Sequence, residues 1–149
     1  MRARTTALLA ALAIILSGCS SSGDASGVKI EVPDIPMHES MGEFEGEVNI
    51  VNWSGFVDPK WTDKFEADTG CKVNSRVAGT SDEMVTLMRT GQYDIVSASG
   101  DAALRLIVGG DVQPLNVDLI PNFSDEIATG MRNNIYDTVN GKPYGVPIG

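Results

Sequence analysis

The sequence contains little cysteine, almost no histidine and few aromatic rings. Of its 149 residues, two are cysteines, one is a histidine and 6% are aromatic. With His38 as the single histidine, the chain cannot build a Ser-His-Asp triad within its fold or a metal site made of several histidines. The Walker A, G-x-G-x-x-G, G-x-S-x-G and H-E-x-x-H patterns are also absent. We therefore expect no catalytic residue, no bound metal and no cofactor.

The N-terminus has the pattern of an export signal. Arg2 and Arg4 precede an apolar run that is too short to span a bilayer, and small residues lead to Cys19. The tetrapeptide Leu-Ser-Gly-Cys resembles the lipobox of bacterial lipoproteins, in which the signal peptide is removed and the cysteine is lipidated. An ordinary secretory signal that happens to carry a cysteine is the alternative. The pattern predicts a signal peptide over residues 1–18 and a mature protein anchored through Cys19 to the outer face of the cell membrane.

Removal of that signal leaves Cys71 as the only thiol. One cysteine cannot form an internal disulfide in an oxidising compartment. We interpret Cys71 as a small residue that enters a strand after Thr69-Gly70; pairing with a partner beyond the end of this chain is the alternative.

Basic side chains are scarce in the mature segment. All twenty acidic residues follow Cys19, and the loss of Arg2 and Arg4 leaves nine basic residues, for a net charge of −11. This charge argues against nucleic acid as a partner and slightly favours a cationic ligand.

Composition divides the mature chain into two parts. Residues 19–46 are rich in serine, glycine, proline and acids without periodicity, which is typical of a flexible tether. Residues 47–149 show alternating strand and helix signals and are long enough for one small core. The chain contains no internal repeat and no second long apolar run.

Three strand and helix units follow one another after the tether. Strands are predicted over 47–53, which is expected to be buried on both faces, over 71–78 and over 93–99. Such an order predicts an α/β fold with a parallel sheet.

The helix boundaries are marked by local signals. Asp58-Pro59 begins the first helix, which places Trp61 and Phe65 on one face and ends at Gly70. Thr80 and Glu83 form a capping box at the start of the second.

The second and third helices have their own patterns. An apolar stripe of Met84, Leu87 and Met88 precedes a stop at Gly91, and Ser99-Gly100-Asp101 begins a third helix that runs to 109–110. Asn140-Gly141 predicts a hairpin whose second arm heads away from the domain. The chain ends on that strand-like arm, so we expect it to be incomplete.

Candidate ligand contacts follow from the sheet. Ligands of open parallel α/β sheets bind at the carboxyl ends of the strands, so the loops 53–56, 79–82 and 97–101 are expected to meet. They offer rings, hydroxyls and carboxylates, which suit a small organic ligand. The candidate ligand-binding residues are Trp53, Ser54, Phe56, Ser99, Asp101 and Asp82.

Each candidate also has a structural explanation. Trp53 and Phe56 would equally cover the first helix. Asp82 and Asp101 lie in first helical turns, where the helix dipole favours a carboxylate, and Ser99 is a good N-cap.

From residue 47 onward the chain resembles a known family. The segments VNIVNWSGFVDP, FEADTGCKV, YDIVSAS, VQPLN, IPNFSDE and GKPYGVPIG are similar, in order and spacing, to bacterial extracellular solute-binding proteins of the spermidine/putrescine type. These proteins serve ABC importers. The resemblance implies a periplasmic-binding-protein-like lobe with a parallel-rich sheet and flanking helices, and a second lobe that we expect to be missing from this chain.

The resemblance also implies roles for individual residues. Trp53 and Phe56 would be rings that line the site, and Ser54 and Ser99 would be polar contacts of an amine held between two lobes. Two positions depart from the family: Phe56 stands where a tyrosine is common, and Gly55 stands where some members place an acid. One partner for an ammonium group is therefore missing.

The sequence thus predicts a monomeric, non-enzymatic polyamine-binding lipoprotein that delivers its ligand to a membrane permease. Alone, the lobe would offer half a site and bind weakly or not at all. A binding protein for a sugar, an opine or another amine remains an alternative, as do, less favoured, an exported enzyme and a structural lipoprotein.

Overall fold

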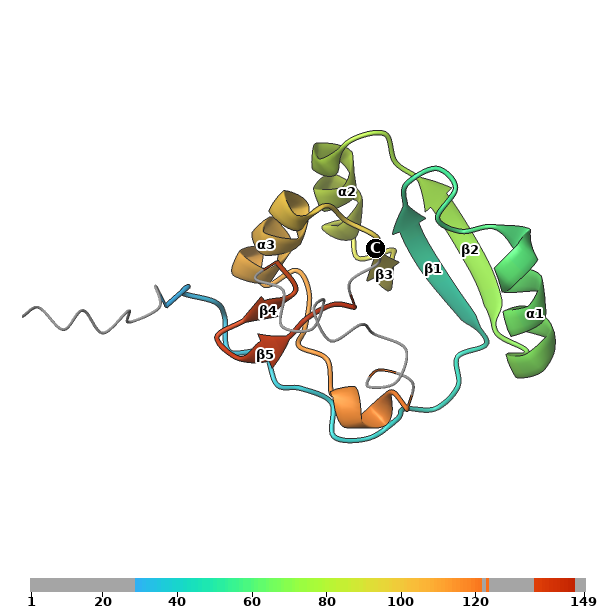
Figure 1. Cartoon of the computed structure of the whole chain (residues 1–149), viewed down its shortest axis with the longest axis horizontal. Coiled ribbons are helices and arrows are strands. Elements are labelled where there is room, and N and C mark those ends of the chain that lie inside the picture. Colours follow the sequence, from blue (N-terminus) through green and yellow to red (C-terminus); the bar gives the residue numbers. More distant parts are fainter. Residues whose placement is uncertain (1–28, 122, 124–135, 147–149) are drawn as a thin grey trace, which may run out of the picture.

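In the part of the chain that the structure describes, the larger sheet consists of three parallel strands, and Figure 1 shows their arrangement. In the computed structural model, which describes residues 29–121, 123 and 136–146, β1 (Glu47–Asn52) lies between β2 (Lys72–Val77) and β3 (Ile95–Val96). β1 pairs in parallel with β2 from Glu47↔Lys72 to Asn52↔Val77, and in parallel with β3. The predicted parallel α/β sheet is confirmed. The predicted signal peptide and Cys19 lie outside the described residues.

β3 is shorter than the predicted strand over 93–99. Hydrogen bonds from Asp94 N to Asn49 O at 2.9 Å and from Ser97 N to Val51 O at 2.8 Å continue the pairing on either side of it. The backbone then turns toward the next helix. Residues 97–99 therefore form the loop that leaves the sheet.

The first helix begins and ends as predicted. α1 (Pro59–Thr69) is capped by Asp58, whose side chain accepts a hydrogen bond from Lys60 N at 2.8 Å. Gly70 ends it in the left-handed conformation, with φ 73°, and donates to Glu66 O.

The apolar face predicted on α1 does not pack into the core. Trp61 is 60% exposed and Phe65 is 44% exposed, and α1 buries no side chain. The helix lies beside β2, a strand at the edge of the described sheet (Figure 1). In β1 only Val51 and Asn52 are buried, so the prediction of a strand buried on both faces is wrong for its first four residues.

The second and third helices pack against each other. α2 (Ser81–Met88) is capped by Thr80, whose hydroxyl accepts from Glu83 N at 3.1 Å. The Glu83 carboxylate accepts from Gly79 N at 2.9 Å. α3 (Gly100–Gly109) ends at Gly110 with φ 73°.

The core lies between the sheet, α2 and α3. One group joins Val51 and Ala78 to Met84, and another joins Val85 and Met88 to the buried residues of α3, Ala102 and Leu106. Leu87, predicted on the apolar stripe, is half-buried against the first group, and Val85 was not predicted. Cys71 is a free, buried thiol just before β2, which fits the predicted packing role.

The predicted hairpin is confirmed, but its course differs. β4 (Thr138–Val139) and β5 (Lys142–Pro143) pair antiparallel across Asn140-Gly141, whose φ angles of 50° and 78° suit a type I′ turn. Leu115 N donates to Pro143 O at 2.7 Å. This hydrogen bond holds the second arm on the lobe, so the prediction that it heads away from the domain is wrong as far as Val146.

Part of the segment predicted as a tether contacts the folded lobe. Asn140 Nδ2 donates to Ile30 O at 2.6 Å, and Asn116 Nδ2, at the start of the 3₁₀ turn η1 (Val117–Leu119), donates to His38 O at 3.0 Å. Figure 1 shows this segment running beside the hairpin. Among the described residues, no helix combines the length and apolarity needed to cross a bilayer.

Candidate functional site

A cavity opens where the strands give way to the helices. Its volume is about 430 Å³, within the range of small-molecule sites, and it lies at the carboxyl ends of β1 and β3, as expected for a parallel α/β sheet. The lining comes from the β1–α1 turn, the β3–α3 loop, α3 and the hairpin with its second arm: Trp53, Phe56, Val96, Ser97, Ala98, Ser99, Gly100, Ala103, Leu106, Ile107, Val112, Tyr136, Asp137, Tyr144, Gly145 and Val146.

A tight turn carries the first two rings. Phe56 N donates to Trp53 O at 3.2 Å, and Gly55 has φ 86°, so the turn has the positive φ at its third residue that type II turns require. Both rings thereby line the same cavity. The same angle explains the missing acid at position 55, because an L side chain is strained at this φ.

The buried side-chain amide of Asn52, at the end of β1, supports this turn. Asn52 is 1% exposed, and its Nδ2 donates to Trp53 O at 2.7 Å. Its Oδ1 accepts from Ser75 Oγ of β2 at 2.7 Å. Because both ends of the amide are bonded, the position of the Trp53 backbone is tied to the sheet.

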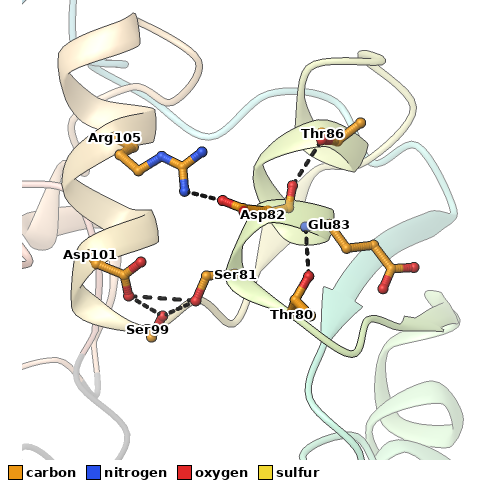
Figure 2. Close-up of polar contacts among 8 residues, drawn as sticks. All are labelled: Thr80, Ser81, Asp82, Glu83, Thr86, Ser99, Asp101 and Arg105. Carbon is orange, nitrogen blue, oxygen red and sulfur yellow. Dashed lines mark hydrogen bonds and ion pairs between the residues drawn. The ribbon is translucent and has the colours of Figure 1, made fainter.

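Ser99 lines the cavity but does not cap α3 with its hydroxyl. It holds the N-cap position without a side-chain cap bond. Its Oγ instead donates to Asp101 Oδ1 at 2.6 Å and lies 2.6 Å from Ser81 Oγ (Figure 2). Either hydroxyl can be the donor between the two serines, and Ser81 Oγ also donates to Asp101 Oδ1 at 3.5 Å. These hydrogen bonds join the first turns of α2 and α3.

The two predicted carboxylates, Asp82 and Asp101, bind other side chains of the protein and do not line the cavity. The Ser99 hydroxyl bond is the main reason why the pKa of Asp101 lies below its ordinary value. Asp82 Oδ1 lies 2.5 Å from Arg105 Nη1 in an exposed ion pair between α2 and α3 (Figure 2). Neither carboxylate lines the cavity, nor does the exposed Ser54. The structure thus brings together Trp53, Phe56 and Ser99 of the six predicted contacts.

The hairpin contributes residues that the sequence did not reveal. Tyr136, Asp137 and Tyr144 line the cavity, and Tyr144 N donates to Asp137 O at 2.7 Å. A Cβ at Gly100 would lie 2.5 Å from Tyr136 Cγ, so the absence of a side chain there lets the ring approach α3. The segment YDTVNGKPYG was visible in the sequence, but its path back over the lobe was not.

Among the described residues that line the cavity, Asp137 is the one acidic side chain, and none is a lysine or an arginine. Burial raises the pKa of its carboxyl above the ordinary value. Among the described residues, no group of three or more acidic, His or Cys side chains lies close enough to hold a metal ion. The cavity therefore combines aromatic rings with a partly buried carboxylate.

These features describe an α/β lobe with a cavity at the carboxyl ends of its parallel strands, and comparison with known proteins shows that its fold is of the periplasmic-binding-protein type. The chain is 28% identical over 80 residues to the putrescine-binding periplasmic protein SpuD of Pseudomonas aeruginosa. The aligned segment covers 52% of this chain and 22% of that protein. The predicted resemblance to the spermidine/putrescine type is confirmed at this level. No family model matches the chain.

Two solved structures share the fold. A spermidine/putrescine ABC transporter protein of Listeria monocytogenes matches 62% of this chain and 29% of its own with a TM-score of 0.57 at 24% identity. The spermidine/putrescine substrate-binding protein PotD of Streptococcus pneumoniae matches 61% and 28%, with a TM-score of 0.56 and 24% identity. The predicted fold class is confirmed, and the chain spans less than a third of each relative.

Proposed function

We propose that this lobe belongs to a substrate-binding lipoprotein of an ABC importer and that it captures polyamines. The observation that carries the proposal is the cavity, which Trp53 and Phe56 line together with the hairpin and where the only charged side chain among the described lining residues is the acid Asp137. Rings bury the methylene groups of an amine, and a carboxylate attracts its charged end. Capture involves no covalent chemistry, so no enzymatic activity is proposed.

The roles of the predicted contacts follow from their places. Trp53 and Phe56 would stack against the ligand, and Ser99 would offer its hydroxyl oxygen from the β3–α3 loop. Ser54, Asp82 and Asp101 remain predictions as ligand contacts, since they lie outside the lining and would meet only a solute that extends beyond it.

The partners and location are part of the same proposal. Lipidation of Cys19 would hold the protein at the outer face of the cell membrane, where an ABC permease would accept the solute. Metabolic labelling with a fatty acid tests the anchor: label is expected in the wild-type protein and absent from Cys19→Ser. Equal labelling of the two would contradict the anchor.

A ligand panel tests the binding function. Putrescine, spermidine, a sugar and an opine are added separately to the full-length mature protein, and the thermal midpoint is measured. Ligands that bind only the folded state raise it. We expect a rise with the polyamines alone. A rise with the sugar or the opine but not with a polyamine would exclude polyamine capture and leave a different solute.

A further inference from the structure

Asp137 differs from Asp82 and Asp101 because its carboxylate has no hydrogen-bond or ion-pair partner among the described residues. Asp101 accepts from Ser99, and Asp82 pairs with Arg105. The five ion pairs in the described part of the chain all leave Asp137 out, and none of the described hydrogen bonds ends on its carboxylate. As far as the described residues go, this carboxylate therefore keeps its oxygens available for a ligand.

The hairpin fixes where this carboxylate lies. The backbone of Asp137 accepts from Tyr144 N at 2.7 Å, and the pairing of β4 with β5 holds the two residues across the hairpin. A Cβ at Gly145 would lie 3.1 Å from Asp137 Oδ1, so the carboxylate rests against the second arm, and both residues line the cavity. The hairpin is in turn held by Leu115 N, which donates to Pro143 O.

No basic side chain among the described residues pairs with this carboxylate. Lys142, the basic residue of the hairpin, lies 3.4 Å from Asp34 and does not line the cavity. The neighbouring lining is aromatic, with Tyr136 and Tyr144 beside Asp137 in the chain and hairpin and with Trp53 and Phe56 from the β1–α1 turn. A partly desolvated acid among rings favours a cation that has an apolar body.

We propose that Asp137 is the residue that binds the ammonium group of an amine in this cavity and selects it over an uncharged solute. The inference rests on the proposed function and deepens it. Asp137 supplies the charge that the β1–α1 turn lacks at Gly55, because the fold brings an acid to the cavity from the hairpin instead.

The test compares ligands and variants of the full-length mature protein by calorimetry. Putrescine is titrated into the wild type, Asp137→Asn and Asp63→Asn; Asp63 is an exposed acid of α1 outside the lining and controls for the change in net charge. Asp137→Asn is expected to weaken putrescine binding about tenfold or more, as the loss of a charged hydrogen bond does, and Asp63→Asn is expected to change it little. The uncharged 1,4-butanediol should bind the wild type and Asp137→Asn alike.

The outcomes separate the two proposals. If no amine binds the wild type, the proposed function fails. If putrescine binds the wild type and Asp137→Asn equally well, this inference is overturned while the proposed function stands. Should Asp137→Asn not fold, the carboxyl ¹³C resonance of Asp137 in the wild type decides: it is expected to shift with putrescine, and an unmoved resonance under saturating amine overturns the inference.

Discussion

The side-chain amide of Asn52 donates to the carbonyl oxygen of Trp53 at 2.7 Å, although the two residues are adjacent in the chain. The hydroxyl of Ser75 reaches the same amide from β2 at 2.7 Å. The turn that carries the Trp53 ring is therefore attached to the sheet by a buried polar link as well as by the chain itself.

Replacement of Asn52 tests this link. Asn52→Ala removes both hydrogen bonds together with the fully buried amide that makes them, so we expect a loss of about 1–3 kcal/mol in the free energy of unfolding, measured in urea. Solute affinity should fall as well, because the Trp53 turn loses its support. Asn74→Ala is the control: Asn74 is only half-buried on the neighbouring strand and should cost less. Equal losses would show that the buried link has no special weight.

Gly55 gives a second prediction. Its φ of 86° is unfavourable for any residue with a Cβ, while no atom lies within 4 Å of the place a Cβ would occupy. Gly55→Ala should therefore destabilise the fold by about 1–2 kcal/mol through backbone strain alone. Gly42→Ala, which meets neither strain nor contact, should be nearly neutral. A neutral Gly55→Ala in thermal unfolding would show that the turn adapts freely.

The hydrogen bond from Ser99 to Asp101 predicts how the pKa of Asp101 changes when the hydroxyl is removed. Removal of the hydroxyl in Ser99→Ala should raise the pKa of Asp101 toward its ordinary value of 3.8, since this bond is the main cause of the lowered pKa. The lowered pKa stabilises the fold at pH values above 3.8 and that stabilisation is lost as the pH falls through the folded pKa. The carboxyl ¹³C titration of Asp101 measures the change. An identical titration curve in Ser99→Ala would contradict the assignment.

Asp137 predicts the opposite dependence. Because burial raises the pKa of its carboxyl above 3.8, the folded state retains the proton to a higher pH than the unfolded chain. Its ionisation therefore lowers stability as the pH rises through this window. Without ligand, Asp137→Asn should raise the thermal midpoint relative to the wild type more at pH 7 than at pH 4. Asp63→Asn reports the effect of net charge alone, and an Asp137→Asn midpoint below that of the wild type at pH 7 would contradict the prediction.

Local signals explain why the helix boundaries could be predicted. Asp58-Pro59, Gly70 and Thr80 act within one turn of their own positions, and the structure places all of them as expected. Parallel pairing followed from the alternation of strand and helix. The burial of side chains could not be predicted in this way. The exposure of Trp61 depends on which other segments cover α1, and the sequence of the helix alone does not determine that.

The part of the site that a single loop forms could be predicted from the sequence. Trp53 and Phe56 share a four-residue turn, so their common direction follows from the sequence itself. Ser99 contacts Ser81 because the first turn of α2 approaches it from another part of the chain, and Asp137 enters because a hairpin folds back over the lobe. Both results depend on contacts between distant segments.

The contact between Asn140 and Ile30 also sets how far the lobe can lie from a membrane. If Cys19 carries the lipid, the segment between the anchor and the contact with the hairpin ends at Ile30. A fully extended stretch of that length spans about 38 Å at most, against about 95 Å for the whole segment to residue 46. The short anchor segment would therefore keep the cavity close to the membrane in which the proposed permease lies.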